Sequence, residues 1–393
     1  PTNGDGDFTT TRNTVATRLN ENGLIEEVAS NVPRLDYSDG GCPSLLLEPL
    51  STNLIQYSED FSDASWGRVK GGVSTIPAIT SNYSTSPDGT VNADRLIFDL
   101  NGGTTSSDFS QLQSSTFVMN ADYSNSIWLK SNTASSYVMS FLKPSGNVTT
   151  ITVTTEWQRF ENSIAVSTTT APIRLRLRSS ESTSVYADIS IWGAQLEQQS
   201  YATSYIKNEG TALGVTRVAD TVNGAGDATV INSTEGVLFA EISALADNSS
   251  MSGADVSVSD TTTSNTIRLI YSPVTSLNSI LVRIDVGGVR SASFDYVGIT
   301  TTNFNKFAVK WKENDFALWV NGIEVLTDLN GATFPLSTLT KVNFNSGSGI
   351  NPFKGKTKDL RVYNTALSDL EIEKLSSWTS FTAMANGQSY TII

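Results

Sequence analysis

The stretch SVYADISIWGAQLEQQSYATSYI, residues 184–206, decides how the rest of the chain is interpreted. Tyr186, Ile189, Ile191 and Trp192 lie in a run of β-branched and aromatic residues, which predicts a strand in a packed sheet. Because Ile191 and Trp192 are adjacent, both faces of this strand are expected to be covered. After Gly193 a polar run leads to YATSYI, a second aromatic segment that leaves the sheet. The stretch therefore predicts the end of one module and the start of the next.

The length and composition of the chain favour two β-domains. The chain has 393 residues, which is long for one ordinary sandwich and fits two domains with connections. Apolar residues make up 38%, enough for sizeable cores. Ser, Thr, Asn and Gly are abundant, and this bias favours strands and turns over helices. We therefore expect an all-β fold.

The charge and the rarest residue types exclude several functions. The net charge is −13, which would repel a phosphate backbone, so nucleic acid is not an expected partner. No apolar run reaches 18 residues, so membrane insertion is not expected either. The sequence has no histidine, which removes histidine triads and histidine-ligated zinc, and its single cysteine, Cys42, cannot form an intrachain disulfide. For an enzyme only paired carboxylates would remain.

Residues 1–48 do not have the pattern of an independent domain. Asn22-Gly23 between two β-capable runs predicts a hairpin. The run Leu45-Leu46-Leu47 needs an apolar partner surface, which so short a segment cannot supply for itself. We expect it to pack on the next domain or on a neighbouring chain.

From Thr52 to Ile206, short strand candidates are separated by turn residues, as in a sandwich. They include RLIFDL, NSIWLKS, YVMSFLK, IRLRLRS and VYADISIW. In IRLRLRS, Ile173, Leu175 and Leu177 predict a core face, and the three arginines between and after them predict a basic face. That basic face has two interpretations, protection of a solvated edge strand or contact with an acidic glycan or a neighbouring subunit.

A second sandwich is indicated from about Glu235 to Leu375, centred on KFAVKWKENDFALWVNGIEV, residues 306–325. Phe307, Val309 and Trp311 share one face, and Asn321-Gly322 can form a type I′ turn. SDLEIEKLSS predicts a helix, with Ser368 and Glu371 as a capping box. The last residues, TSFTAMANGQSYTII, suggest one more strand, able to pair with another chain.

WGAQLE followed by SYATSYI resembles the end of a jelly-roll, carbohydrate-binding-like module common in tailed-phage virion proteins and in some bacterial surface proteins. The segments TRNTVATRLNENGLIEEV, NVPRLDY and GCPSLLLEPLSTNLIQYSEDFSDASW resemble the leader ahead of that module, so the match covers roughly the first 220 residues. The second sandwich resembles the laminin-G and concanavalin-A-like lectins. The domains expected are a leader or anchor (1–48), a jelly roll (49–207), an ordered connector (208–234), a lectin-like sandwich (235–378) and a C-terminal strand or tail (379–393).

Three aromatic residues are candidates for sugar binding. Carbohydrate modules stack an aromatic ring on a pyranose and surround it with polar groups. Trp66 and Tyr83 lie in polar, turn-rich surroundings, and Tyr137 begins a strand. Packing against the leader is an equal interpretation for Trp66. The other tryptophans inside strands are expected in the cores; these are Trp128, Trp157, Trp192, Trp311 and Trp319.

The jelly-roll resemblance also implies a structural Ca²⁺ between the first and last strands of the module. Asp188 in VYADISI matches the ligand position near the end, and Glu59 in YSEDFSD roughly matches the one in the opening loop. Oxygen-only ligands suit calcium. The alternative interpretation is that both acids are simply exposed to solvent.

These observations predict a non-enzymatic structural protein of a tailed-phage virion, a fibre, spike or decoration subunit exposed on the particle surface. Its expected partners are a cell-surface glycan and other virion proteins, and analogy with fibres favours a homotrimer. The carboxylate pattern of laminarinases that share the concanavalin-A-like fold is absent from the sequence. The alternatives are a secreted bacterial carbohydrate-binding protein, a depolymerase spike, and a purely structural virion protein with no ligand.

Overall fold

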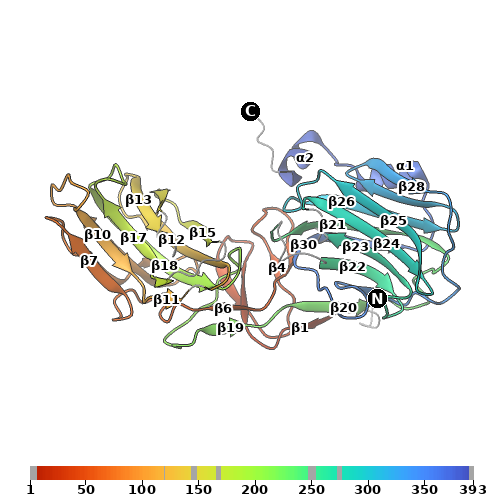
Figure 1. The fold of residues 1–393 in the computed structure, drawn as a ribbon, viewed down its shortest axis with the longest axis horizontal. Coiled ribbons are helices and arrows are strands. Elements are labelled where there is room, and N and C mark those ends of the chain that lie inside the picture. Colours follow the sequence, from red (N-terminus) through yellow and green to blue (C-terminus); the bar gives the residue numbers. More distant parts are fainter. Residues whose placement is uncertain are drawn as a thin grey trace. The chain divides into compact units, whose positions relative to one another are not determined.

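The computed structural model describes residues 7–118, 120–142, 148–164, 170–246, 254–271 and 277–388. These residues form antiparallel sheets and two short helices (Figure 1). The prediction of an all-β chain with two antiparallel sandwiches is confirmed. The chain forms two compact units. The jelly-roll unit comprises residues 14–29 and 50–218, and the C-terminal unit comprises residues 1–13, 30–49 and 219–393.

Two five-stranded sheets build the jelly-roll unit. The first, in the order β14-β13-β17-β10-β7, consists of β7 (Gly67–Gly71), β10 (Phe109–Gln113), β13 (Tyr137–Leu142), β14 (Val148–Val153) and β17 (Arg174–Arg178). The second, in the order β15-β12-β18-β9-β8, consists of β8 (Ala78–Thr85), β9 (Val91–Asp99), β12 (Tyr123–Ser131), β15 (Gln158–Ile164) and β18 (Tyr186–Glu197). Three small pairs add β2 (Ala16–Leu19) with β3 (Ile25–Val28), β6 (Ser51–Asn53) with β19 (Val215–Arg217), and β11 (Phe117–Val118) with β16 (Thr170–Ala171).

The strand IRLRLRS is an inner strand of the first sheet. Ile173, Leu175 and Leu177 are buried in the core, as predicted. Because β17 pairs with β10 on one side and β13 on the other, the interpretation of its arginines as edge protection is wrong. Arg176 is itself buried and binds Glu181, at 2.7 Å from Nε to Oε2, since a guanidinium on a covered face needs a carboxylate partner.

The WGAQLE motif forms the long central strand β18, and its glycine has a structural reason. Gly193 has a φ of +65°, a conformation that L side chains rarely adopt, and a Cβ there would lie 3.0 Å from Trp128 Cδ1. The register between β12 and β18 shifts near this residue, between Ser126 and Trp128. The glycine therefore accommodates a β-bulge in the middle of the second sheet.

Two seven-stranded sheets build the C-terminal unit. The first, in the order β1-β20-β29-β22-β23-β24-β25, consists of β1 (Thr9–Thr11), β20 (Thr221–Ala225), β22 (Ala254–Ser259), β23 (Thr266–Tyr271), β24 (Ser279–Val286), β25 (Val289–Val297) and β29 (Lys341–Asn343). The second, in the order β28-β27-β26-β21-β30-β5-β4, consists of β4 (Leu35–Asp36), β5 (Ser44–Leu47), β21 (Glu235–Ala244), β26 (Asn305–Lys312), β27 (Phe316–Val320), β28 (Ile323–Asp328) and β30 (Gly355–Tyr363).

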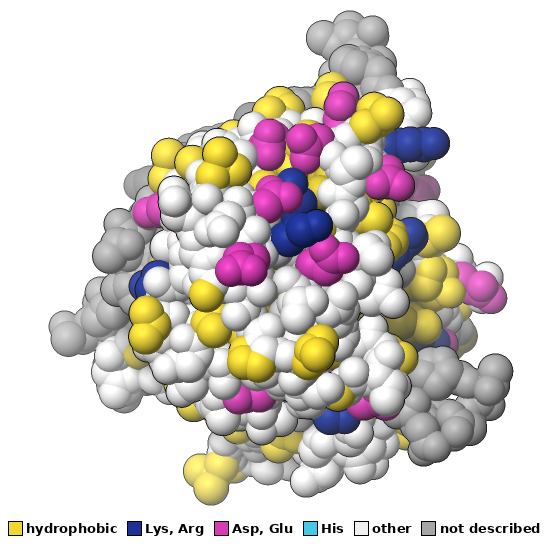
Figure 2. Space-filling view, turned by 90° about the vertical axis from the view of Figure 1, so that its right-hand side faces the viewer, with side chains coloured by type: hydrophobic (Ala, Val, Ile, Leu, Met, Phe, Trp, Pro, Cys, Tyr) yellow, Lys and Arg dark blue, Asp and Glu magenta, His cyan; other side chains and the backbone are white. Residues whose placement is uncertain are grey.

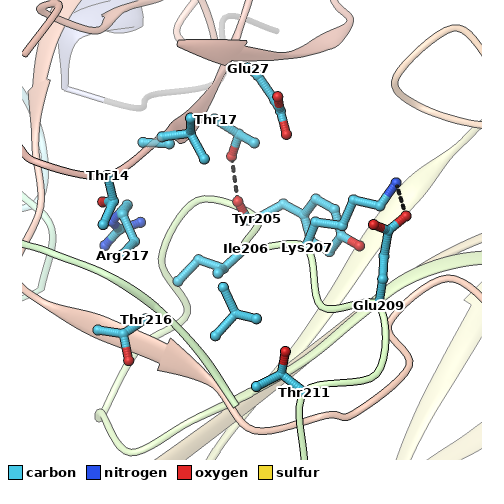
Figure 3. Close-up of a pocket in the computed structure, with 13 residues that line it drawn as sticks. Thr14, Thr17, Glu27, Tyr205, Ile206, Lys207, Glu209, Thr211, Thr216 and Arg217 are labelled. Atoms are coloured by element: carbon cyan, nitrogen blue, oxygen red, sulfur yellow. Dashed lines mark hydrogen bonds and ion pairs between the residues drawn. The ribbon is translucent and has the colours of Figure 1, made fainter. Parts of the chain in front are cut away.

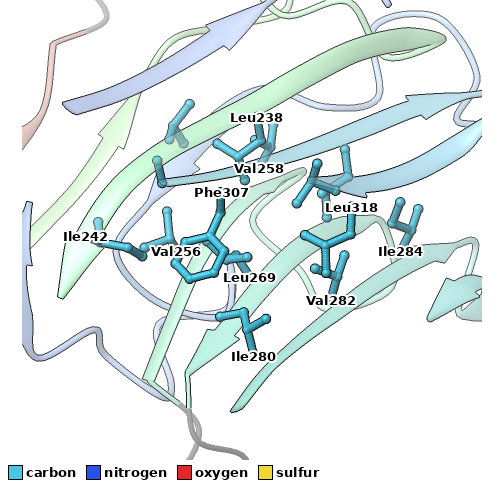
Figure 4. Packing of buried hydrophobic residues seen from close by; sticks show 14 of the residues in the cluster. Leu238, Ile242, Val256, Val258, Leu269, Ile280, Val282, Ile284, Phe307 and Leu318 are labelled. Carbon is cyan, nitrogen blue, oxygen red and sulfur yellow. The ribbon is translucent and has the colours of Figure 1, made fainter. Parts of the chain in front are cut away.

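The core between these two sheets is formed by the alternating apolar residues of the strands (Figure 4). Phe307, Val309 and Trp311 lie in it, as their spacing predicted. The Asn321-Gly322 turn joins β27 to β28 with both residues at positive φ, 51° and 88°, which a type I′ turn requires. The sequence therefore predicted this part of the fold correctly.

Residues 1–48 do not form a separate leader. The predicted Asn22-Gly23 hairpin exists as β2 and β3, and it belongs to the jelly-roll unit, where Ile25 packs with Trp192 and Tyr205. The segments on either side of the hairpin belong to the C-terminal unit. There β5 pairs with β30, and Leu47 enters the core, so the leucine run finds its apolar partner within this chain.

The connector is ordered, as expected, because β19 pairs with β6 and β20 pairs with β1 and β29. The predicted helix is α1 (Asp369–Ser376), and the Glu371 carboxylate accepts the Ser368 N–H at 2.9 Å. The predicted C-terminal strand is instead the helix α2 (Phe381–Gly387) where the structure describes it, because Ser380 Oγ accepts the Ala383 N–H at 3.0 Å and begins a helical turn. Residues 389–393 of that prediction lie outside the described residues.

Acidic side chains are more frequent than basic ones on the face of the molecule in Figure 2, in keeping with the net charge of −13. In the upper middle of that face, several acidic side chains gather around basic ones. Among the described residues, the helices are too short and too polar to cross a membrane.

Candidate functional site

A set of polar and aromatic side chains covers part of the outer face of the sheet β15-β12-β18-β9-β8. We call Tyr83, Arg95, Asn132, Tyr186 and Asp188 the arginine platform. Ser190 lies opposite Arg95 in the register of β18 and β9, and the adjacent residues Leu96 and Ile189 point into the core. Strand alternation therefore directs Arg95 and Asp188 to the opposite, outer face.

Hydrogen bonds fix the geometry of the arginine platform. Arg95 Nε donates to Asp188 Oδ1 at 2.8 Å, and a second guanidinium nitrogen binds Asp188 Oδ2. Asn132 Nδ2 donates to the same carboxylate at 2.9 Å. Ser190 Oγ donates to Asn132 Oδ1 at 2.7 Å, so a chain of bonds runs across the sheet surface. Side chains held in this way lose little conformational freedom when a ligand binds.

Two tyrosine rings flank the ion pair. The Arg95 guanidinium lies over the Tyr83 ring, 4.9 Å from its centroid. Tyr83 and Tyr186 are 46% and 40% exposed, so the parts of the two rings that Arg95 and Tyr137 do not cover are open to solvent. The arginine platform therefore combines accessible rings with a preorganised set of donors and acceptors.

The ionisation of the platform is set by the ion pair. The bond to Asp188 raises the pKa of Arg95, and the bond to Arg95 lowers the pKa of Asp188. Burial raises the pKa of the Tyr186 phenol, and the nearby Asp188 adds to this effect. At neutral pH the platform therefore carries a charged arginine, a charged aspartate and a neutral Tyr186 hydroxyl.

Three of the five site residues predicted from the sequence lie together here. Tyr83 is part of the platform, and Asp188 holds Arg95. Tyr137 is buried, and its ring meets Tyr186 edge-on with 6.5 Å between the centroids. The Tyr137 hydroxyl lies 2.8 Å from Thr133 Oγ1. Tyr137 therefore packs against Tyr186 of the platform and does not present a ring to solvent. For Tyr137 the prediction of a sugar-binding surface ring is wrong.

Trp66 is a core residue, so its prediction as a sugar-binding ring is also wrong. Its side chain is 5% exposed and packs on Phe61, with 4.9 Å between the ring centroids. Its indole nitrogen donates to the Tyr57 carbonyl at 2.8 Å. The polar, turn-rich sequence around Trp66 indicated exposure, but the ring belongs to the buried core of the jelly-roll unit.

Glu59 and Asp188 do not fit the calcium site that the resemblance implies. Asp188 binds Arg95 and Asn132, whereas Glu59 Oε1 accepts the Tyr205 hydroxyl at 2.8 Å and Glu59 Oε2 lies 3.2 Å from Lys207 Nζ. A cation already neutralises each carboxylate. Across the described parts of the chain, acidic and cysteine side chains form no group of three or more that could hold a metal ion.

Glu59 lines a polar pocket of about 410 Å³ in the jelly-roll unit. Burial raises the pKa of Glu59, and burial also raises the pKa of Asp94 in the same pocket. Both oxygens of Asp94 accept backbone N–H groups, from Phe61 at 2.9 Å and from Asn82 at 3.0 Å. Asp94 therefore holds the surrounding loops together and is not free to act on a ligand.

Lys207 and Glu209 also line a second pocket, of about 500 Å³ (Figure 3). Lys207 Nζ lies 2.7 Å from Glu209 Oε1. The hairpin contributes Thr17, whose hydroxyl donates to the Tyr205 carbonyl at 2.6 Å (Figure 3). Tyr205 is 5% exposed, and its ring packs on Trp192 at 4.4 Å between centroids. This pocket offers no exposed ring for stacking, so the arginine platform is the stronger candidate for sugar binding.

Sequence reasoning missed Arg95 and Tyr186. The alternation of Leu96 and Phe98 in RLIFDL predicts that Arg95 points outward, but the pairing of β9 with β18 is a tertiary contact that brings it to Asp188. The expected burial of the strand tryptophans holds for Trp192, Trp311 and Trp319, whereas Trp128 and Trp157 are only partly buried.

No protein-family model matches the sequence, and no curated protein matches it. Among solved structures, the chain is similar to the heptameric SAP-like pentraxin from Limulus polyphemus, with 15% identity, 39% of this chain and 74% of that chain covered, and a TM-score of 0.31. It is also similar to the xylan-binding domain from Paenibacillus barcinonensis, with 13% identity, 39% and 94% covered, and a TM-score of 0.25.

A third similar structure is the LG4-5 pair of the mouse laminin alpha1 chain, with 11% identity, 78% of this chain and 94% of that chain covered, and a TM-score of 0.25. TM-scores between 0.25 and 0.31 are too low to show that this chain is related to any of these proteins. The class of this protein therefore rests on its own structure: an antiparallel β-sandwich protein with two units.

Proposed function

We propose that the jelly-roll unit binds a glycan through the arginine platform. The observation that carries the proposal is the combination of the exposed Tyr83 ring with a polar network that is already ordered. An aromatic ring can stack on the apolar face of a pyranose, and the partly exposed Arg95 guanidinium, held in place by the buried Asp188, and the Asn132 amide can bond to its hydroxyls. Because the partners are preorganised, binding would require little ordering of side chains.

Replacement of Tyr83 by alanine is expected to weaken glycan binding about tenfold, because a lost stacking contact of about 1.4 kcal/mol corresponds to that factor. Tyr83→Phe, which keeps the ring, should bind like the wild type. Arg95→Gln should also weaken binding, since it removes the guanidinium that the ion pair with Asp188 holds at the surface. Candidate ligands would come from a glycan array, and affinities from calorimetry on the full chain.

The matched control is Arg361→Gln, which breaks an arginine–aspartate pair of similar length, 2.6 Å, on the surface of the other unit. This variant should bind the glycan normally. Unchanged affinity in both Tyr83→Ala and Arg95→Gln would contradict the proposal. If no glycan in the array binds the wild type, the purely structural alternative is favoured instead.

The chain is further proposed to be non-enzymatic. A depolymerase would need two free carboxylates that face each other across a groove. The polar pocket contains four carboxylates, but each is engaged: Glu59 with Tyr205 and Lys207, Glu209 with Lys207, Asp94 with two backbone N–H groups, and Asp60 with Ser62. Release of reducing ends from any bound polysaccharide would overturn this part of the proposal.

The wider role we propose is that of a structural protein on the surface of a tailed-phage particle, as a homo-oligomer with a trimer favoured. The resemblance of roughly the first 220 residues to such proteins supports it. Mass spectrometry of purified virions should find the chain at a fixed ratio to capsid and tail proteins. Recovery only from culture supernatant or bacterial envelopes would replace this role with that of a secreted carbohydrate-binding protein.

A further inference from the structure

A row of polar side chains crosses the outer face of the sheet β1-β20-β29-β22-β23-β24-β25 in the C-terminal unit. The register places Asn343 opposite Ser257, Ser257 opposite Arg268, and Arg268 opposite Arg283. The residues that alternate with them on these strands, such as Leu269, belong to the core. The four side chains therefore lie side by side on the face that points away from the core.

Several polar atoms in and beside this row lack hydrogen-bond partners among the described residues. They are Ser257 Oγ, Thr266 Oγ1, Asp255 Oδ1 and Arg283 Nε, and all four atoms are buried. A buried polar atom without a partner costs about 1–3 kcal/mol, so such atoms are rare in folded proteins. Of these four residues, Arg283 is partly exposed, so a group from solvent can reach its guanidinium and complete its bonding.

The charges in this row do not cancel. Arg268 binds Asp255, with Nε donating to Oδ2 at 2.8 Å and a second nitrogen 2.6 Å from the same oxygen. Arg283 Nε has no hydrogen-bond partner among the described residues, although the Arg283 charge acts on Asp255. Burial raises the pKa of Asp255 to about 7, although the positive charges of Arg268 and Arg283 both oppose the shift. Two guanidinium groups, those of Arg268 and Arg283, therefore lie beside one carboxylate, that of Asp255, in this row.

We propose that Arg283, with Arg268 beside it, binds a carboxylate or sulfate group of a ligand. A guanidinium presents two parallel N–H donors, which match the two oxygens of such an anion. Both arginines are partly exposed at the surface of the sheet, so the anion reaches them from solvent. The neighbouring strand β25 offers the exposed Ser293, opposite Arg283, as a hydroxyl partner for the rest of the ligand.

Two other charged groups on this sheet bear on the proposal. Asp295 is exposed on the same face, opposite Leu281, where its charge would repel an anion at Arg283. Arg290 binds Asp285 at 2.6 Å and so carries no free positive charge. Asp295 is thus the residue whose neutralisation should strengthen binding, and Arg290 is an arginine on the same sheet that should not contribute.

The test is a titration of the full chain with three probes: a uronic-acid tetrasaccharide, a sulfated oligosaccharide and inorganic sulfate. Arg283→Gln should weaken binding of the anionic probe at least tenfold, and Asp295→Asn should strengthen it about twofold to fivefold. Arg290→Gln should bind like the wild type. Wild-type affinity should fall as salt concentration rises.

The three probes distinguish the sources of the anion. Binding of a saccharide but not of sulfate would assign the site to an acidic glycan, and equal binding of sulfate would assign it to a free oxyanion. Failure of every probe to bind, or unchanged binding by an Arg283→Gln protein with normal thermal unfolding, would overturn the proposal. Because Tyr83→Ala lies in the other unit, it should not affect this binding, so the outcome is independent of the proposed glycan site.

Discussion

Replacement of Asp220 by asparagine is expected to lower the free energy of unfolding of the C-terminal unit by about 3–5 kcal/mol. Arg12 Nη1 donates to Asp220 Oδ1 at 2.9 Å, and an Arg34 nitrogen binds Asp220 Oδ2. Both arginine side chains are completely buried. Without the aspartate, a positive charge would remain in the protein interior with too little negative charge near it.

Asp220 also joins three segments of the chain in this unit. Its backbone N–H donates to the Glu48 carbonyl at 3.0 Å, the Glu48 N–H donates to Asp220 Oδ2 at 3.0 Å, and Glu48 Oε2 lies 2.6 Å from Arg34. Loss of the charge should therefore loosen residues 7–13 and 30–49 together. Denaturant unfolding followed by the tryptophans of the C-terminal unit would measure the change.

The control for this prediction is Asp359→Asn. Asp359 and Arg361 form an ion pair of 2.6 Å, but their side chains are 28% and 55% exposed. An exposed pair contributes about 1 kcal/mol or less, so this variant should unfold almost like the wild type. Equal stability of the two variants would show that burial does not set the cost of the Asp220 substitution.

Replacement of Trp66 by alanine is expected to destabilise the jelly-roll unit by about 3–5 kcal/mol, the range for a large buried aromatic side chain. The substitution would leave a cavity beside Phe61 and would free the Tyr57 carbonyl from its bond to the indole. Thermal and denaturant unfolding would measure this loss. Trp66→Phe should cost less, because it retains most of the buried ring.

A comparison of Trp66→Ala with Tyr83→Ala separates a role in the core from a role in sugar binding, which the sequence could not distinguish for these two residues. Tyr83 is 46% exposed, so its loss should change stability little while it weakens glycan binding. Trp66→Ala should have the opposite profile, with lower stability and, in the folded protein, normal affinity. A Trp66→Ala protein of normal stability that fails to bind glycan would contradict this expectation and would show that Trp66 is a binding residue.

The sequence alone determined the parts of this protein that depend on local pattern. Alternation placed Ile173, Leu175 and Leu177 in one core and Phe307, Val309 and Trp311 in the other. Gly23 in the first hairpin and Asn321-Gly322 in the second set the two turns, because few other residues adopt positive φ at low cost. Ser368 with Glu371 set the start of α1. Each of these features depends on residues only a few positions apart.

Only the tertiary structure decided where the chain's separate segments meet. Arg95 and Asp188 are 93 positions apart and Arg12 and Asp220 are 208 apart, and these pairs exist because particular strands are neighbours. Strand neighbours are chosen by the burial of whole sheet faces, which no single segment encodes. The same global choice buried Trp66, left Tyr83 exposed and divided residues 1–48 between the two units. The fold class could therefore be read from local patterns, whereas the candidate site required the long-range pairing of strands.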